Sequence, residues 1–236
     1  MSIIILCFQW LGILFVTALI HESGHALACL QQLRKEGLHH GLLPLLDVVL
    51  EQPIGMKFVT LALESTDNRV MAGKGVSPGF LFASLLWHQV VEKWTAYRAA
   101  GESPIPALHL AADDVLDSQT EKLALQRKIG SDMRDIWSMQ PRFERRNGKA
   151  PYKLLEHLRF RAGYDFLLLR CESGEIDMEI GEWWTAFYEG DAVAREQLLT
   201  TAVASPAGAK RKRPPRRSAR KTIGEGGNTT GSTGEE

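Results

Sequence analysis

The chain has 236 residues, of which 44% are hydrophobic, and this content excludes a wholly disordered or collagen-like protein. Its 28 Lys and Arg residues balance its 28 Asp and Glu residues, so the formal net charge is zero. The charges are unevenly placed, because residues 205–236 hold eight basic and three acidic side chains and leave 20 basic and 25 acidic ones in residues 1–204. An acidic body therefore carries a basic tail, which favours a polyanionic partner.

The N-terminus is strongly apolar. Residues 3–20 form 18 consecutive uncharged positions, which at 1.5 Å per residue just span a bilayer core of about 30 Å. We interpret residues 1–22 as an apolar leader that forms a transmembrane helix or a buried helix, or that reflects a misassigned start. A signal peptide is disfavoured, because the start lacks a basic region and no small-residue cleavage site follows. Membrane association is expected only if this leader is genuine.

The middle of the chain is predicted to be helical almost throughout. From residue 23 to about 201, apolar residues recur at spacings of three and four, and no stretch alternates with period two for long enough to predict a strand. Ser77 and Pro78 have the pattern of a helix N-cap followed by proline, and the apolar residues 80–87 predict the most buried helix. The fold class is therefore all-α, with an irregular multi-helix body.

Prolines and polar caps predict the later helices. Pro104 or Pro106 begins a helix that runs to about Leu123, and Ser131 begins another that ends close to Pro141. Three more helices are expected over 161–170, over 175–188 and around 195–199.

After residue 204 the composition changes to Ser, Pro, Gly, Thr, Lys and Arg, which have almost nothing to bury. Such a segment cannot offset the entropy cost of ordering, so we predict a disordered basic tail. The chain is thus divided into four parts. They are the apolar leader (1–22), a helical body (23–125), a helical arm (126–204) and the disordered tail rich in Arg and Lys (205–236).

Residues 21–25 match the pattern H-E-x-x-H. On a helix, His21 and His25 share a face and could ligate zinc, with Glu22 as general base for a metal-bound water. Because it directly follows the apolar residues 3–20, the motif resembles the first membrane helix of a zinc metalloprotease of the site-2 type, which is the alternative function. Such a site needs a third protein ligand, but Asp47 lies in a segment too short to span a membrane. We prefer a chance junction of the leader with an ordinary helix start, with no metal bound.

Residues 127–161 form a basic segment with ten basic and four acidic side chains. Guanidinium groups pair bidentately with phosphates, and Phe143, Tyr152 or His157 could stack on unpaired bases. The alternative is a solvated loop between two helices with ordinary ion pairs. The basic residues are Arg127, Lys128, Arg134, Arg142, Arg145, Arg146, Lys149, Lys153, Arg159 and Arg161.

The tail contains a second basic cluster. A flexible polycation gains affinity by releasing counterions from a nucleic-acid backbone, without reading its sequence. An acidic membrane or a protein partner could bind the same cluster. Its residues are Lys210, Arg211, Lys212, Arg213, Arg216 and Arg217.

Two other groups of residues are given structural interpretations. Asp113, Asp114 and Asp117 are assigned to capping or to a solvated helix face rather than to a metal site, because only the first and last share a face. Trp183 and Trp184 are expected to be one core aromatic and one partly exposed aromatic.

Several long motifs in the right order closely resemble the C-terminal part of the bacterial poly(A) polymerase I family, class II nucleotidyltransferases related to the CCA-adding enzymes. The likeness covers about residues 23 to 200. The motifs are GLHHGLLPL (37–45), PGFLFASLLW (78–87), DMRDIWSMQPRF (132–143), KLLEHLRFRAGYDFLLLR (153–170) and GEWW (181–184).

The resemblance implies binding of single-stranded RNA 3′ ends by a bacterial, cytoplasmic protein of RNA polyadenylation and decay. In the family, catalysis belongs to an N-terminal head, where a Gly-Ser element and paired aspartates hold Mg²⁺ for ATP. No Gly-Ser followed by Asp-x-Asp occurs here, so we expect this chain to bind no cofactor and to be inactive alone. A separate catalytic head or RNA-decay proteins are the expected further partners. A nonfunctional remnant is the remaining alternative.

Overall fold

The computed structural model describes residues 26–36, 53–123 and 126–204. Within these ranges it contains nine α-helices, one short 3-10 helix and no strand, which confirms the predicted all-α fold. The apolar leader, the H-E-x-x-H motif and the basic tail lie outside the described residues. None of the helices in the described ranges is both long and apolar enough to span a membrane.

The helices follow one another with short connections, and most of the predicted ones are present. The helices that begin at Pro78 and at Pro104 start where the prolines predict. The elements are α2 (Ala26–Lys35), α5 (Pro53–Met71), α6 (Pro78–Ala99), α7 (Pro104–Leu123), α8 (Arg127–Met139), the 3-10 helix η1 (Gln140–Arg142), α9 (Ala150–Leu155), α10 (Phe160–Ser173), α11 (Met178–Glu189) and α12 (Ala192–Ala204).

Helix α8 begins four residues before the predicted start at Ser131. Ser131 is exposed within the helix, and Gln126 occupies the N-cap without a side-chain cap bond. Packing explains the earlier start, because Ile129 lies against the core and Gly130 approaches Leu116 of α7. A contact with a distant helix has therefore overridden a local capping signal.

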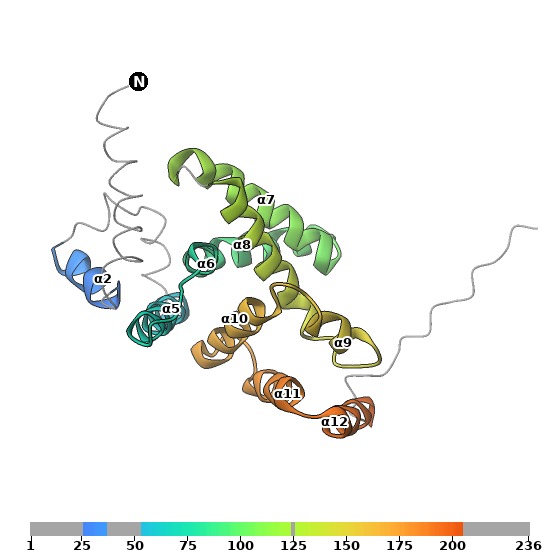
Figure 1. Cartoon of the computed structure of the whole chain (residues 1–236). Coiled ribbons are helices and arrows are strands. Elements are labelled where there is room, and N and C mark those ends of the chain that lie inside the picture. Colours follow the sequence, from blue (N-terminus) through green and yellow to red (C-terminus); the bar gives the residue numbers. More distant parts are fainter. Residues whose placement is uncertain (1–25, 37–52, 124–125, 205–236) are drawn as a thin grey trace, which may run out of the picture.

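Helix α6 lies at the centre of the body, as Figure 1 shows. The hydroxyl of Ser77 accepts a hydrogen bond from the backbone N–H of Phe80 at 3.4 Å, so Ser77 caps the helix as predicted. Every residue from Leu81 to Trp87 is buried. Because it is apolar on all sides, α6 can be surrounded by α5, α7, α8 and α10. The continuous burial of residues 81–87 agrees with the prediction for this segment. The helix as a whole is not the most buried one, because nine of its 22 residues are buried, compared with nine of 14 in α10 (Phe160–Ser173).

The first of two hydrophobic cores is built from α2, α5, α6, α7, α8 and one face of α10. The ring of Phe166 on α10 contacts the rings of Phe58 and Trp87 edge-on, with centroids 5.3 Å apart in both pairs. The indole N–H of Trp137 on α8 donates to the carbonyl oxygen of Ala83 on α6 at 3.1 Å. Aromatic packing of this kind, together with a satisfied indole, sets the position of α8 and α10 against α6.

The second core lies on the opposite face of α10 and is covered by α9, α11 and α12, with Met139 at the end of α8 and Phe143 just after η1. Trp184 is fully buried there, and its indole N–H donates to the carbonyl oxygen of Phe143 at 2.8 Å. Trp183 is partly exposed, so the expectation of one core and one partly exposed tryptophan is confirmed. Because α10 serves both cores, it fixes the position of the second set of helices relative to the first.

Candidate nucleic-acid interface

Four of the ten basic residues predicted as RNA contacts are bound to carboxylates. These pairs join α8 to α7, the η1–α9 segment to α11, and the start of α10 to α8, while the fourth lies within α10. A phosphate would have to compete with each carboxylate, so these arginines serve first to hold the helices together. The pairs are Arg134–Asp113 at 2.8 Å, Arg146–Glu179 at 2.8 Å, Arg159–Asp132 and Arg161–Asp165 at 3.0 Å.

The other six basic residues are exposed and form no ion pair with any described residue. Arg127 and Lys128 begin α8. The remaining four, Arg142, Arg145, Lys149 and Lys153, follow one another over η1, a turn and α9, and we call them the arm cations. The arm cations lie on structured backbone, because Gly148 in the left-handed conformation (φ +58°) closes the turn between them. The alternative of a solvated loop with ordinary ion pairs still fits residues 143–149 between η1 and α9, where Arg145 and Lys149 are exposed and Arg146 pairs with Glu179.

The three aromatic residues predicted to stack on bases differ in their exposure to solvent. Phe143 is only 1% exposed and packs edge-on against Trp184 at 4.9 Å, so the prediction that it stacks on RNA is wrong. The 3-10 turn at η1 directs its side chain into the second core. Tyr152 and His157 are half-buried and keep part of their surface in solvent.

The aspartates of α7 hold helices together. Asp113 pairs with Arg134 of α8, as described above. Asp114 accepts hydrogen bonds from the Tyr97 hydroxyl at 2.7 Å and from Lys93 Nζ at 3.2 Å, both on α6. These two bonds, the one from Tyr97 first, lower the pKa of the Asp114 carboxyl. Across the described ranges, no three His, Cys, Asp or Glu side chains converge as a metal site would require.

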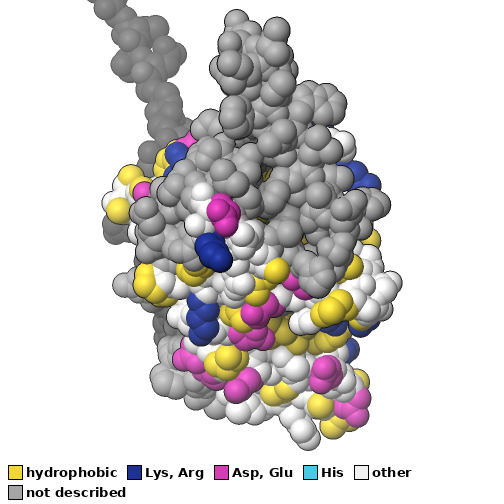
Figure 2. Space-filling model, turned by 90° about the vertical axis from the view of Figure 1, so that its left-hand side faces the viewer, with side chains coloured by type: hydrophobic (Ala, Val, Ile, Leu, Met, Phe, Trp, Pro, Cys, Tyr) yellow, Lys and Arg dark blue, Asp and Glu magenta, His cyan; other side chains and the backbone are white. Residues whose placement is uncertain are grey.

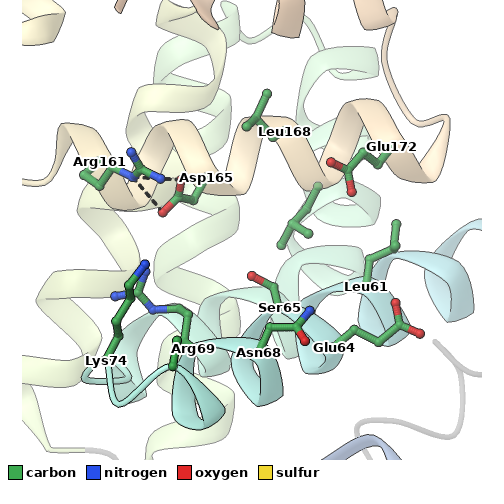
Figure 3. Close-up of a pocket in the computed structure, with 12 residues that line it drawn as sticks. Leu61, Glu64, Ser65, Asn68, Arg69, Lys74, Arg161, Asp165, Leu168 and Glu172 are labelled. Carbon is green, nitrogen blue, oxygen red and sulfur yellow. Dashed lines mark hydrogen bonds and ion pairs between the residues drawn. The ribbon is translucent and has the colours of Figure 1, made fainter. Parts of the chain in front are cut away.

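A groove of about 390 Å³ lies between α5 and α10 (Figure 3), within the size range of small-ligand sites. Its lining includes two basic residues that the sequence interpretation missed, Arg69 at the end of α5 and Lys74 just after it. Arg161 of α10 lines the opposite wall. Arg161 is far from Arg69 and Lys74 in the sequence, and no motif connects it to them. Only the packing of α5 against α10 brings them together.

Hydrogen bonds hold the groove arginines in place. Arg69 donates from Nε and Nη2 to the carbonyl oxygen of Gly75 at 3.3 and 3.0 Å, and no described carboxylate pairs with it or with Lys74. Arg161 binds Asp165, which raises the pKa of the guanidinium and keeps it charged. Its guanidinium also lies 5.7 Å from the ring centroid of Tyr188. The two arginines of this groove are therefore positioned in advance.

A second hollow of about 230 Å³ continues the groove toward the link between α9 and α10. The two hollows share Ser65, Arg69, Arg161 and Asp165, so they form one continuous surface. The second hollow adds Arg159 and Leu158, whose side chain is 93% exposed.

The basic character of the surface is local. Figure 2 shows one face of the molecule, on which the described acidic, basic and hydrophobic side chains are interspersed. The described side chains on this face therefore give it no single sign of charge.

The chain is similar to known proteins over most of its length. The family model described as the polymerase A arginine-rich C-terminus matches residues 100–218. A poly(A) polymerase I from Salmonella typhi is 32% identical over 211 residues, covering 84% of this chain and 44% of that protein. Proteins of the same name from Haemophilus influenzae and Escherichia coli O157:H7 are 33% and 36% identical, covering 75% and 69% of this chain and 40% and 36% of themselves. The chain therefore spans less than half the length of these relatives.

Proposed function

The chain belongs to the polymerase A arginine-rich C-terminus family, and from this premise we propose that it is the RNA-binding part of a bacterial polynucleotide adenylyltransferase. The observation that carries the proposal is the set of arm cations, which are exposed, form no ion pair with a described residue, and lie inside the matched region. Basic side chains without a carboxylate partner are available to neutralise the phosphates of an RNA backbone.

The other cations have smaller or different roles in this proposal. Arg134, Arg146, Arg159 and Arg161 contribute less per residue, because a phosphate has to share each of them with a carboxylate. Arg127 and Lys128 add exposed charge at the start of α8. The basic cluster of the tail, residues 210–217, adds contacts that do not depend on RNA sequence.

Adenylate transfer is proposed for the longer enzyme that the relatives represent. The family resemblance links that activity to ATP, Mg²⁺ and single-stranded RNA 3′ ends in the bacterial cytoplasm. The division of the helices into a body over 23–125 and an RNA-binding arm over 126–204 remains a proposal about function. The zinc protease alternative is not favoured, because the relatives that cover 84% of the chain carry the name of a polymerase.

Titration of a labelled 12-nucleotide single-stranded RNA, followed by fluorescence anisotropy at several salt concentrations, tests the RNA-binding role. The double variant Arg145→Gln/Lys149→Gln removes two arm cations. The control Lys35→Gln/Arg98→Gln removes one exposed Lys and one exposed Arg from α2 and α6. With two fewer phosphates neutralised, binding should weaken about tenfold at low salt and the plot of log affinity against log salt should flatten by about 1.4.

The control should keep both the affinity and the salt slope of the unmodified chain. Two results would contradict the proposal. One is RNA binding that is absent or independent of salt. The other is an equal loss of affinity in the two double variants, because charge removal anywhere would then have the same effect.

A further inference from the structure

The groove between α5 and α10 has two chemically different ends, as Figure 3 shows. Arg69, Lys74 and Arg161 gather at one end. Glu64 and Glu172 lie at the other end, on opposite walls. A ligand that fits this surface needs a negative group at one end and hydrogen-bond donors at the other. A bare anion would satisfy only the basic end.

The basic end suits a phosphate. Arg69 is held by its two hydrogen bonds to the Gly75 carbonyl, which leave Nη1 without a bond to any described residue. Lys74 is exposed next to it, and Arg161 is oriented by Asp165. Because the two arginines are held before a ligand arrives, binding a phosphate to them costs less side-chain entropy than it would among free surface cations.

The middle and the acidic end suit the edge of a nucleobase. The amide of Asn68 points into the groove between the two ends, and Asn side chains pair with bases that present an amine beside a ring nitrogen. The carboxylates of Glu64 and Glu172 accept hydrogen bonds from an exocyclic amine, which adenine, cytosine and guanine have and uracil lacks. Leu61 of α5 points into the groove, and its half-buried apolar side chain can contact the face of such a base.

The continuation of the groove favours a strand over a free nucleotide. The second hollow shares the basic end and adds Arg159, which can meet a neighbouring phosphate. Leu158 stands at this hollow with an exposed apolar side chain, and a further base can pack on it. The hollow also reaches the link to α9, which carries the arm cation Lys153.

We propose that this groove binds one nucleotide of a single-stranded RNA, with its phosphate at Arg69, Lys74 and Arg161 and its amine-bearing base at Asn68, Glu64 and Glu172. The proposal rests on the RNA-binding function proposed above and adds a preference for bases that carry an amine. The arm cations then hold the backbone without reading bases, and the groove discriminates between them.

The test compares labelled ten-nucleotide oligoadenylate and oligouridylate on the full chain. Arg69→Gln/Lys74→Gln should weaken binding of both RNAs about tenfold, whereas the control Lys35→Gln/Arg98→Gln should not. Replacing Arg69 removes its hydrogen bonds to the Gly75 carbonyl as well as its charge. The Lys74 side chain has no partner among the described residues, so the single variant Lys74→Gln removes a charge alone. Asn68→Ala changes the middle of the groove and Glu172→Gln its acidic end. Each should lower the ratio of oligoadenylate affinity to oligouridylate affinity about fivefold.

An unchanged affinity ratio in Asn68→Ala and Glu172→Gln, or a basic-end variant that behaves like its control, would overturn the proposal. Competition with AMP distinguishes the two sources of a nucleotide. Displacement of the RNA by AMP at an equal nucleotide concentration would also overturn it, since the site would then hold free nucleotides. Salt-dependent RNA binding that weakens only in Arg145→Gln/Lys149→Gln would support the proposed function and contradict the proposal that the groove binds a nucleotide. A chain that binds no RNA would remove both.

Discussion

Arg170 is the residue whose contacts join the two cores. It is 7% exposed and binds Glu175 through Nε at 3.0 Å and Nη2 at 2.9 Å, while Nη1 donates to Gln140 Oε1 at 3.2 Å. Its guanidinium lies 4.9 Å from the ring centroid of Trp87, whose indole N–H donates to Glu175 at 2.8 Å. Trp87, Gln140, Arg170 and Glu175 thus form one network of hydrogen bonds and an ion pair that connects α6, η1, α10 and the segment after α10. Burying such a network lowers the stability of the fold little while every member has its partner. Removing one member destabilises the fold strongly, because it leaves a buried charge or polar group unpaired.

Replacing Arg170 with Met should therefore destabilise the fold by about 3 kcal/mol, because Glu175 keeps its charge in a mostly buried position without a counter-charge. The double variant Arg170→Met/Glu175→Gln should lose clearly less, since a glutamine oxygen still accepts the bond from Trp87. Urea unfolding followed by circular dichroism measures both values. If the single and double variants were equally unstable, the interpretation of an uncompensated buried charge would be wrong.

At the scale of elements, two adjacent tryptophans on α11 have opposite hydrogen-bonding states. Trp184 donates to the Phe143 carbonyl and thereby ties α11 to the segment after η1. The indole nitrogen of Trp183 is buried and has no hydrogen-bond partner among the described residues, although its ring stacks on Phe187 at 5.0 Å. A buried donor without a partner lowers stability relative to an apolar group of similar shape.

The two tryptophans consequently provide a matched pair of substitutions. Trp184→Phe should cost about 1–3 kcal/mol in the free energy of unfolding, because it leaves the Phe143 carbonyl oxygen without its donor and opens space in the core. Trp183→Phe keeps a ring that can stack on Phe187 and removes the unpaired N–H together with part of the ring system, so it should cost clearly less than Trp184→Phe. Thermal unfolding by circular dichroism gives the order of the two variants. Equal losses would show that ring volume, rather than hydrogen bonding, decides stability here.

For the whole molecule, the separation of charge between an acidic body and a basic tail is the dominant electrostatic feature. The tail is predicted from its composition to bury almost nothing, so its charges should act on RNA binding and not on folding.

Changing Lys210, Arg211, Lys212, Arg213, Arg216 and Arg217 to Gln should leave the melting temperature unchanged. It should also flatten the salt dependence of RNA binding, by about 0.7 for each phosphate that the tail no longer neutralises. A control chain in which the order of residues 205–236 is shuffled keeps the charge and should bind like the original. Anisotropy and calorimetry measure the two properties. A lower melting temperature, or RNA binding as strong as before, would count against this role.

Much of the fold could be predicted because its signals are local. A serine followed by a proline before an apolar segment favours a helix start, as at Ser77 and Pro78, and Pro104 marks the start of the next helix. The start of α8 was misplaced, since packing of its first turn against α7 outweighs a serine that resembles a cap. Phe143 was misassigned for a related reason, because a single 3-10 turn decides whether an aromatic next to arginines faces solvent or the core.

The amino-acid sequence alone determined the all-α class, the separation of the acidic body from the basic tail, the basic segment over 127–161 and the likeness to poly(A) polymerase I. These features follow from composition, periodicity and motif order, which can be read along the chain without knowing how distant segments pack. The tertiary structure alone decided which arginines are bound to carboxylates, that Phe143 is buried, and that Arg69 and Lys74 share a groove with Arg161. Ion pairs and grooves depend on distances between residues far apart in the chain, and those distances are set only when the helices pack.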